Sequence, residues 1–274
     1  MHAMPQGSRA TDEVVQMSAL LLRGMLAGIL AGFLSFCFAT VFTEPLIDRA
    51  IALEALSSQA GHHEHGEDGA HSATAPQHEH GTDVGRDTQS GPGLLLGLTV
   101  LGAAVGGLFS LVFAFCMGRV GPSDPRVLSM LIALSGFFSL VLVPTLKYPA
   151  NPPGVGNPET IEGRTLLFFS LLAMSVIAFS AAVHLCKKIS KTKDLFSSCM
   201  IASVVYVGVM TVVLLALPSY DEAPQNYPAN LLWTYRLASV GTQASMWLGL
   251  GISFGLWAYR LSTRAAKPMT LKMS

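Results

Sequence analysis

Residues 18–43 read SALLLRGMLAGILAGFLSFCFATVFT, an apolar run with one formal charge, Arg23. A helix needs roughly 17–25 such residues to cross the hydrocarbon core of a bilayer. The run is too long for a signal-peptide core and no clear cleavage site follows it, so we expect a retained membrane-spanning helix. Five further runs of this kind follow, at Gly93–Met117, Val127–Val143, Leu166–Cys186, Leu195–Leu217 and Leu237–Tyr259.

The composition agrees with a membrane protein. Hydrophobic residues make up 51% of the 274 residues and charged residues 12%, against roughly 25% charged in ordinary globular chains. Lys+Arg and Asp+Glu both number 17, so no net charge favours nucleic acid. We therefore predict an all-α fold, a polytopic membrane helical bundle of six transmembrane helices that forms a single integral-membrane domain over residues 1–274.

The distribution of basic residues predicts the orientation of the bundle. With six spans, twelve of the 17 Lys and Arg residues fall on the side of the two termini and five on the other side. Such an excess marks the cytoplasmic side. Both termini should therefore be cytoplasmic, in a multi-pass protein of a bacterial inner membrane. The third run is the shortest and stops at Pro144, so a re-entrant segment there is the alternative to a full span.

The polar segment at residues 44–92 should be an extracytoplasmic, largely disordered loop, because it lacks apolar periodicity. Only Leu46–Leu56 keeps helical spacing and would extend the first helix. Imidazole and carboxylate groups are ligands that divalent transition metals prefer, although ligand type alone does not separate cobalt, nickel and zinc. The residues we expect to bind such a metal are His62, His63, His65, His71, His78, His80, Glu64 and Glu79.

The predicted spans contain few residues that could carry catalysis or bind a metal. No Asp or Glu lies at the middle of a predicted span, and no phosphate-binding G-x-x-x-x-G-K-[ST] loop occurs. No nucleophile–base pair stands out either, so we predict neither an enzyme nor a prosthetic group. For a metal path the candidates are Glu44 and Asp48, at the outer end of the first helix, and Gln243 inside the last one.

The connection between the third and fourth runs is rich in proline, which removes backbone donors and fixes φ. This predicts a stiff extended segment, either an outer plug or lid or a short structured connector. Lys147 and Arg164 should brace the loop rather than touch a cation, because like charges repel. The residues of this structural set are Pro144, Lys147, Tyr148, Pro149, Pro152, Pro153, Pro158, Glu159 and Arg164.

Three features together resemble the CbtA family of cobalt transporter subunits. They are the outward histidine segment, the Pro144–Thr165 loop and the pattern Trp233, Arg236, Gln243, Trp247. The resemblance covers essentially the whole chain. It implies a membrane protein of five or six helices, usually paired with CbtB, a small single-helix partner with histidines of its own. The resemblance also implies that the transported metal is cobalt, because the family is associated with cobalamin metabolism. The spacing of the residues alone does not indicate cobalt.

We therefore predict a membrane transporter subunit for uptake of a divalent transition metal, with cobalt implied by the resemblance. The histidine segment would raise the metal concentration at the mouth. Two alternatives stay open: a nickel or zinc permease, and a non-transporting metal-binding membrane scaffold or sensor. The expected partners are the lipid bilayer, the metal ion and a CbtB-type subunit, with no nucleic acid; an oligomer is left open.

Overall fold

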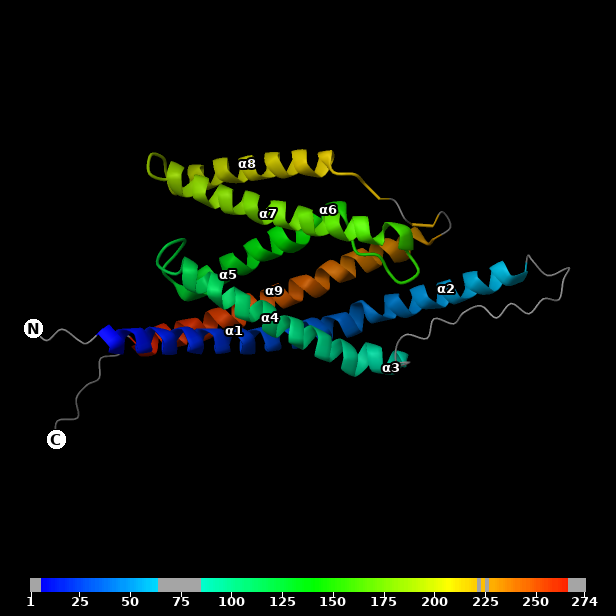
Figure 1. Cartoon of the computed structure of the whole chain (residues 1–274), viewed down its shortest axis with the longest axis horizontal. Coiled ribbons are helices and arrows are strands. Elements are labelled where there is room, and N and C mark those ends of the chain that lie inside the picture. Colours follow the sequence, from blue (N-terminus) through cyan, green and yellow to red (C-terminus); the bar gives the residue numbers. More distant parts are fainter. Residues whose placement is uncertain (1–5, 64–84, 221–222, 225–226, 266–274) are drawn as a thin grey trace, which may run out of the picture.

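The computed structural model describes residues 6–63, 85–220, 223–224 and 227–265, and over these residues it contains helices and no strand. The predicted all-α fold is therefore confirmed. The long helices run side by side along one direction, as Figure 1 shows. Within this described part, five segments are long and apolar enough to cross a membrane, and they correspond to the first five predicted runs. They are Met17–Phe42, Arg86–Cys116, Pro125–Lys147, Ile161–Ile189 and Leu195–Ala216.

The last helix, α9 (Ala229–Ala265), is 37 residues long but is not among these five. Gly, Ser, Thr and Gln side chains dilute its apolar content. It packs along α1 (Gln6–Phe42) and along α5 (Pro125–Gly136), in the middle of the bundle. A helix that is covered by protein on several faces needs less apolar surface than one that faces lipid.

The helices α1 and α4 (Leu94–Cys116) pack backbone against backbone. Gly28 lies against Gly102 and Gly106, and a Cβ atom at position 28 would collide with the carbonyl oxygen of Gly102. Gly24 and Gly32 lie on the same face of α1, one turn to either side, and meet α4 in the same way. The four-residue spacing of glycine therefore serves close helix packing where lipid supplies no hydrophobic drive.

A second layer is formed by α7 (Ile161–Ile189) and α8 (Leu195–Ala216). Asp194 caps α8 by accepting a hydrogen bond of 2.9 Å from the backbone nitrogen of Ser197, and this bond lowers the pKa of the Asp194 carboxyl. Between the layers, α7 packs against the π-helical turn η2 (Phe137–Leu142) and α6 (Val143–Lys147). Near the connection between α7 and α8, the sulfurs of Cys186 and Cys199 are 3.0 Å apart.

Pro144 was expected to end the third span, and this expectation is wrong. The segments α5, η2 and α6 follow one another without a break from Pro125 to Lys147. Proline in a helix lacks a donor and clashes with the preceding turn. The wider π-helical turn directly before Pro144 makes room for its ring, and the helix continues for another turn. The described segment is thus long enough for a full span.

The predicted loop at 44–92 differs from the structure at both of its ends. A helix, α2 (Glu44–His63), follows α1 directly after Thr43, with Pro45 in its first turn. Its residues Leu46 and Ala50 are buried, and α2 packs against α9. At the other end, α3 (Arg86–Thr88) and η1 (Gln89–Gly93) lead into α4. Burial of the apolar face that carries Leu46 and Ala50 explains why the start of the predicted loop is helical. Residues 64–84 lie outside the described part.

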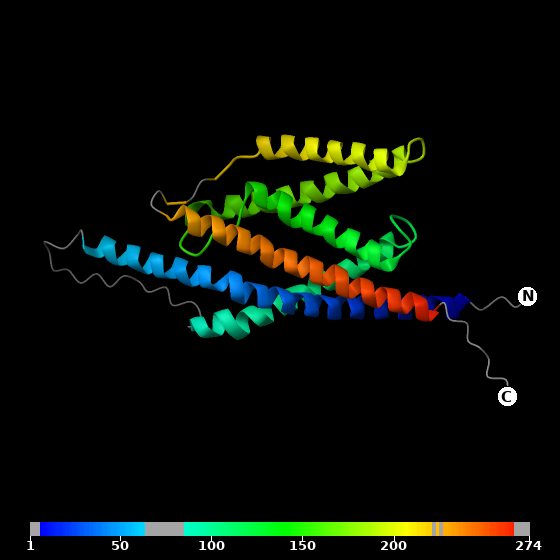
Figure 2. The same ribbon diagram turned by 180° about the vertical axis from the view of Figure 1, so that it is seen from behind.

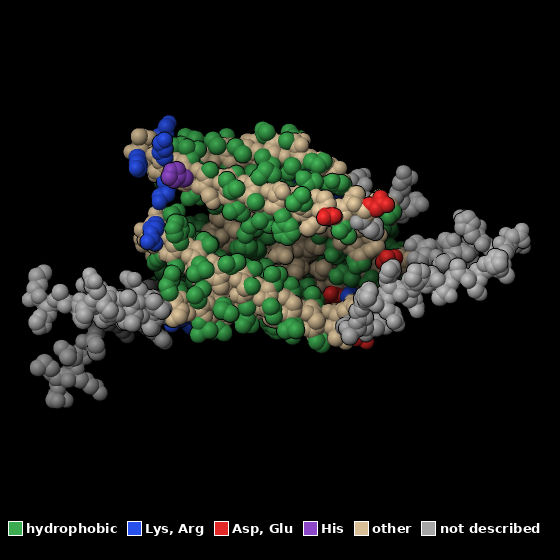
Figure 3. Space-filling model, viewed as in Figure 1, with side chains coloured by type: hydrophobic (Ala, Val, Ile, Leu, Met, Phe, Trp, Pro, Cys, Tyr) green, Lys and Arg blue, Asp and Glu red, His purple; other side chains and the backbone are tan. Residues whose placement is uncertain are grey.

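The connections gather at two ends of the bundle. The start of α1, the end of α9 and the α4–α5 and α7–α8 connections lie at one end, on the left in Figure 1 and on the right in Figure 2. The α2–α3 end, the proline-rich loop and the α8–α9 connection lie at the other. On the face in Figure 3, Lys and Arg side chains gather mostly at the first end and Asp and Glu side chains at the second.

Candidate functional site

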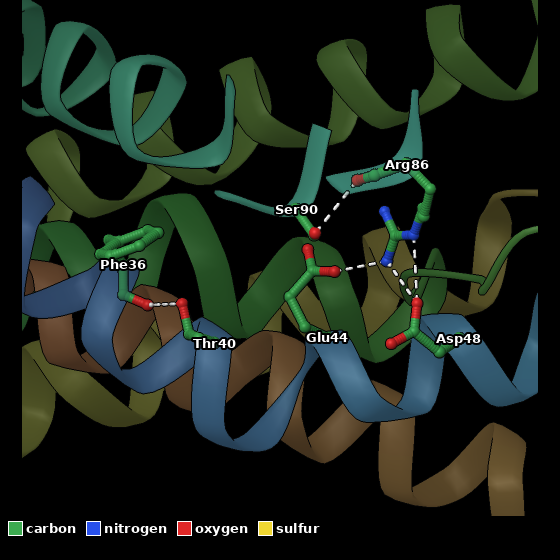
Figure 4. A network of polar contacts seen from close by, with 6 residues as sticks. All are labelled: Phe36, Thr40, Glu44, Asp48, Arg86 and Ser90. Atoms are coloured by element: carbon green, nitrogen blue, oxygen red, sulfur yellow. Dashed lines mark hydrogen bonds and ion pairs between the residues drawn. The ribbon is translucent and has the colours of Figure 1, made fainter. Parts of the chain in front are cut away.

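A carboxylate pair stands at the start of α2. Glu44 and Asp48 are four residues apart and so project from one face of the helix. Arg86, at the start of α3, bonds both: its Nη2 donates to Oε2 of Glu44 and, at 2.9 Å, to Oδ1 of Asp48. Its Nε donates to the same Asp48 oxygen at 3.1 Å. Figure 4 shows the guanidinium between the two carboxylates. One cation thus already bridges the two acids.

The two acids differ strongly in environment. The Glu44 side chain is 10% exposed, the Asp48 side chain 62% and the Arg86 side chain 33%. A buried carboxylate is unfavourable unless it is paired, so Glu44 depends on Arg86 more than Asp48 does. Next to Glu44, the hydroxyls of Thr43 and Thr242 are 3.0 Å apart and join the turn between α1 and α2 to α9. The pair is therefore anchored on the central helix.

Sequence reasoning found Glu44 and Asp48 but missed Arg86. The signal was available in part, because Arg86 is the only Lys or Arg residue between Arg49 and Arg119. Its partner Glu44 lies 42 positions earlier, however, and no local pattern joins the two. The ion pairs of Arg86 with Glu44 and Asp48 join the two ends of the chain segment that carries the histidine cluster.

The predicted histidine ligands are placed only in part. His62 and His63 end α2, and with a rise of 1.5 Å per residue they lie about 27 Å along the helix axis from Glu44. The far end of α2 projects beyond the rest of the bundle in Figures 1 and 2. Within the described residues, no three His, Cys, Asp or Glu side chains come together as a metal site. Outside those residues lie Glu64, His65, His71, His78, Glu79 and His80.

A cavity of about 930 Å³ lies between α4, α7 and α9, with η2 and α6 behind it. Figure 3 shows the surface hollowed between α4 and α7. Residues from successive turns on one face of α9 line this cavity, in keeping with helical periodicity. They include all four residues of the pattern singled out above: Trp233, Arg236, Gln243 and Trp247.

The proline-rich loop forms the end wall of the cavity. Tyr148, Pro149 and Asn151 line it, and Pro152 behind them is fully buried. The Tyr148 hydroxyl donates to the carbonyl of Pro218 at 2.9 Å, and burial raises the pKa of Tyr148. The loop is therefore a packed connector that also closes one end of the cavity.

The other residues of the predicted structural set take different positions. Lys147 donates to the hydroxyl of Ser219 at 2.8 Å, so it braces the α8–α9 connection rather than the proline loop. Arg164 lines the cavity. Pro158 begins the short 3₁₀ helix η3 (Pro158–Thr160), and the backbone nitrogen of Glu159 donates to Asn157 at 2.9 Å. Pro153 is exposed.

The candidate path residues do not form one site. Gln243 lines the cavity, whereas Glu44 and Asp48 do not. The described residues around the cavity include two arginines and neither Asp nor Glu, which makes it unfavourable for a bare divalent cation. The carboxylate pair and the cavity are therefore two distinct sites with opposite charge.

A family model described as "Probable cobalt transporter subunit (CbtA)" matches residues 17–259. The chain belongs to the CbtA family. The match takes in the carboxylate pair and the whole cavity. The family description indicates a role in cobalt transport, and the word subunit implies a partner. Together with five membrane-capable helices, the family makes this CbtA protein a multi-pass membrane protein. Neither a curated protein nor a solved structure matches the chain.

Proposed function

We propose that this protein is the membrane-embedded subunit of a transporter that takes up cobalt from the outer side. The family supports the metal and the activity. The observation that carries the proposal is the carboxylate pair, since Glu44 and Asp48 both bond the cationic side chain of Arg86 at the base of the histidine-rich segment. Carboxylate oxygens suit a divalent metal that histidines have gathered nearby.

The proposed topology has six spans, with α9 as the sixth. This helix has the same length as α1 and runs beside it in the opposite direction. Its addition places the described ends of α1 and α9 on one side, where the basic side chains gather. By the positive-inside rule this side is cytoplasmic, in an inner membrane. The chain then forms one integral-membrane domain, and α2 and the histidine-rich segment face outward.

In this proposal Arg86 occupies the position through which the metal passes. A divalent ion carries twice the charge of a guanidinium and binds the same carboxylate oxygens, so it exchanges with Arg86. In the chain, the proposed metal ligands lie between Asp48 and Arg86: His62, His63, His65, His71, His78 and His80, with Glu64 and Glu79. Metal that these ligands gather is delivered to Glu44 and Asp48, which precede the histidine-rich segment in the chain.

The partner in this proposal is a CbtB-type subunit with a single helix. The word subunit in the family description supports a partner. An apolar surface for a further helix or for lipid is available on α8, where Val204, Val207 and Leu215 are exposed. Uptake should therefore be measured with and without such a partner.

The test is uptake of labelled cobalt into proteoliposomes that hold the full chain. Glu44→Gln should lower the initial rate at least tenfold, because it removes the buried carboxylate from the path. Glu162→Gln, an exposed acid at the start of α7, is the matched control and should leave the rate unchanged. Uptake that Glu44→Gln does not alter would overturn the proposed path.

The same assay separates the alternatives. Nickel or zinc that competes with labelled cobalt at lower concentration would make the protein a permease for that metal. Liposomes that bind cobalt without accumulating it, with or without the partner, would favour a scaffold or sensor.

A further inference from the structure

We propose that the cavity between α4, α7 and α9 binds an amphipathic anion, with its phosphate or carboxylate group at Arg236 and its apolar part along the inner walls. This site is separate from the carboxylate pair. It does not depend on the proposed cobalt path, because a bare cation and a cavity with two arginines repel each other.

The charged end of the cavity is incompletely satisfied. Arg236 donates from Nη2 to Oδ1 of Asn151 at 3.0 Å. Its Nε is buried and has no hydrogen-bond partner among the described residues. Arginine presents its donors in a planar fork that fits a phosphate or carboxylate with two parallel bonds. An oxyanion beside Asn151 would accept from this Nε.

A second arginine reinforces this preference. Arg164 on α7 lines the same cavity as Arg236 on α9, and no acid of the described chain lines it with them. The charged side chains that the described residues contribute to the cavity lining are thus both cationic, which favours an anion over a cation as its ligand.

The rest of the cavity calls for an apolar body. Its walls beyond the arginines are mostly aliphatic and aromatic, and Leu101, Val105, Leu140, Val240 and Trp247 are among them. A volume of about 930 Å³ falls in the range of pockets that hold whole organic ligands. An inorganic anion alone would leave most of this space unfilled.

The position of the cavity favours a membrane phospholipid as the source of the anion. The hollow opens between α4 and α7 in Figure 3. Both helices also carry exposed apolar side chains, such as Val100 and Phe169. Arg236 lies seven residues into α9, about 10 Å from its first residue, at a depth that phospholipid headgroups reach. Acyl chains then occupy the apolar walls.

Direct binding to the purified full-length protein in detergent tests this inference. Trp233 and Trp247 line the cavity, so phosphatidylglycerol with brominated acyl chains should quench tryptophan fluorescence on binding. Brominated phosphatidylcholine should bind at least tenfold more weakly. Arg236→Gln should weaken phosphatidylglycerol binding about ten- to a hundredfold, and Arg236→Lys less than that, because a charge-assisted hydrogen bond is lost. Arg49→Gln, an exposed arginine on α2 at the same end, is the control and should bind normally.

Competition with inorganic phosphate identifies the source of the anion. Phosphate that fails to displace the lipid supports a phospholipid as ligand. Phosphate that binds as tightly as the lipid would overturn the apolar half of the inference. Equal binding of the two lipids, or normal lipid binding by Arg236→Gln, would overturn all of it. Val240→Phe, which narrows the cavity without changing its charge, should also weaken quenching and gives a second test if Arg236→Gln does not fold.

Discussion

Replacing Arg86 by glutamine should destabilise the protein mainly through Glu44. Glu44 is 10% exposed, so its carboxylate would remain buried without its partner. Breaking a fully buried pair costs about 3–5 kcal/mol. The one-third exposure of Arg86 admits some water, so about 2–3 kcal/mol is expected here. Asp48, at 62% exposure, should contribute less than about 1 kcal/mol to this loss.

A double-mutant cycle isolates the Glu44–Arg86 interaction. The free energy of unfolding in mixed micelles is measured for wild type, Arg86→Gln, Glu44→Gln and the double variant. The double variant should be more stable than the sum of the single losses predicts, because it leaves no unpaired charge in the interior. The pair Asp48→Asn and Arg86→Gln is the matched control and should show little coupling. A coupling energy near zero for Glu44 and Arg86 would refute the reasoning.

Three further predictions concern the packing that holds the two sites. Gly28→Leu should destabilise the protein by about 1–3 kcal/mol or prevent folding, because the new Cβ meets the backbone of Gly102. Gly97→Leu is the control and should be tolerated in the same unfolding assay, because a Cβ at position 97 meets open space. Tyr148→Phe should lose about 1 kcal/mol at neutral pH with the hydrogen bond to Pro218. Burial raises the pKa of Tyr148, so the folded state holds the phenol proton more tightly than the unfolded state does. Wild type should therefore lose stability as the pH rises above about 10. The same alkaline loss of stability in Tyr148→Phe would contradict this role of Tyr148. A mild oxidant such as copper phenanthroline should join Cys186 to Cys199, whose sulfurs are 3.0 Å apart, and peptide mass spectrometry that finds both thiols free would argue against the α7–α8 pairing.

The helical elements could be predicted from the sequence because hydropathy and length are local properties. The run at Leu195–Leu217 corresponds to the helix Leu195–Ala216, and the first run to the segment Met17–Phe42. The four-residue spacing of Gly24, Gly28 and Gly32 is a local signal for a close helix contact, although the spacing does not identify α4 as the partner. The helix continues past Pro144, contrary to the prediction, because a π-helical turn before a proline depends on how neighbouring helices pack.

The candidate sites divide in the same way. Residues four apart on one helix, such as Glu44 and Asp48, share a face whatever the rest of the chain does, so the sequence was sufficient to pair them. The metal ligands of the histidine cluster remain a prediction. Arg86 reaches Glu44 only because α2 and α3 meet at one end of the bundle. The cavity needs α4, α7 and α9 together, and no local pattern encodes a space between three helices. Side chains distant in sequence acquire a shared charge environment only when the tertiary fold places them around it.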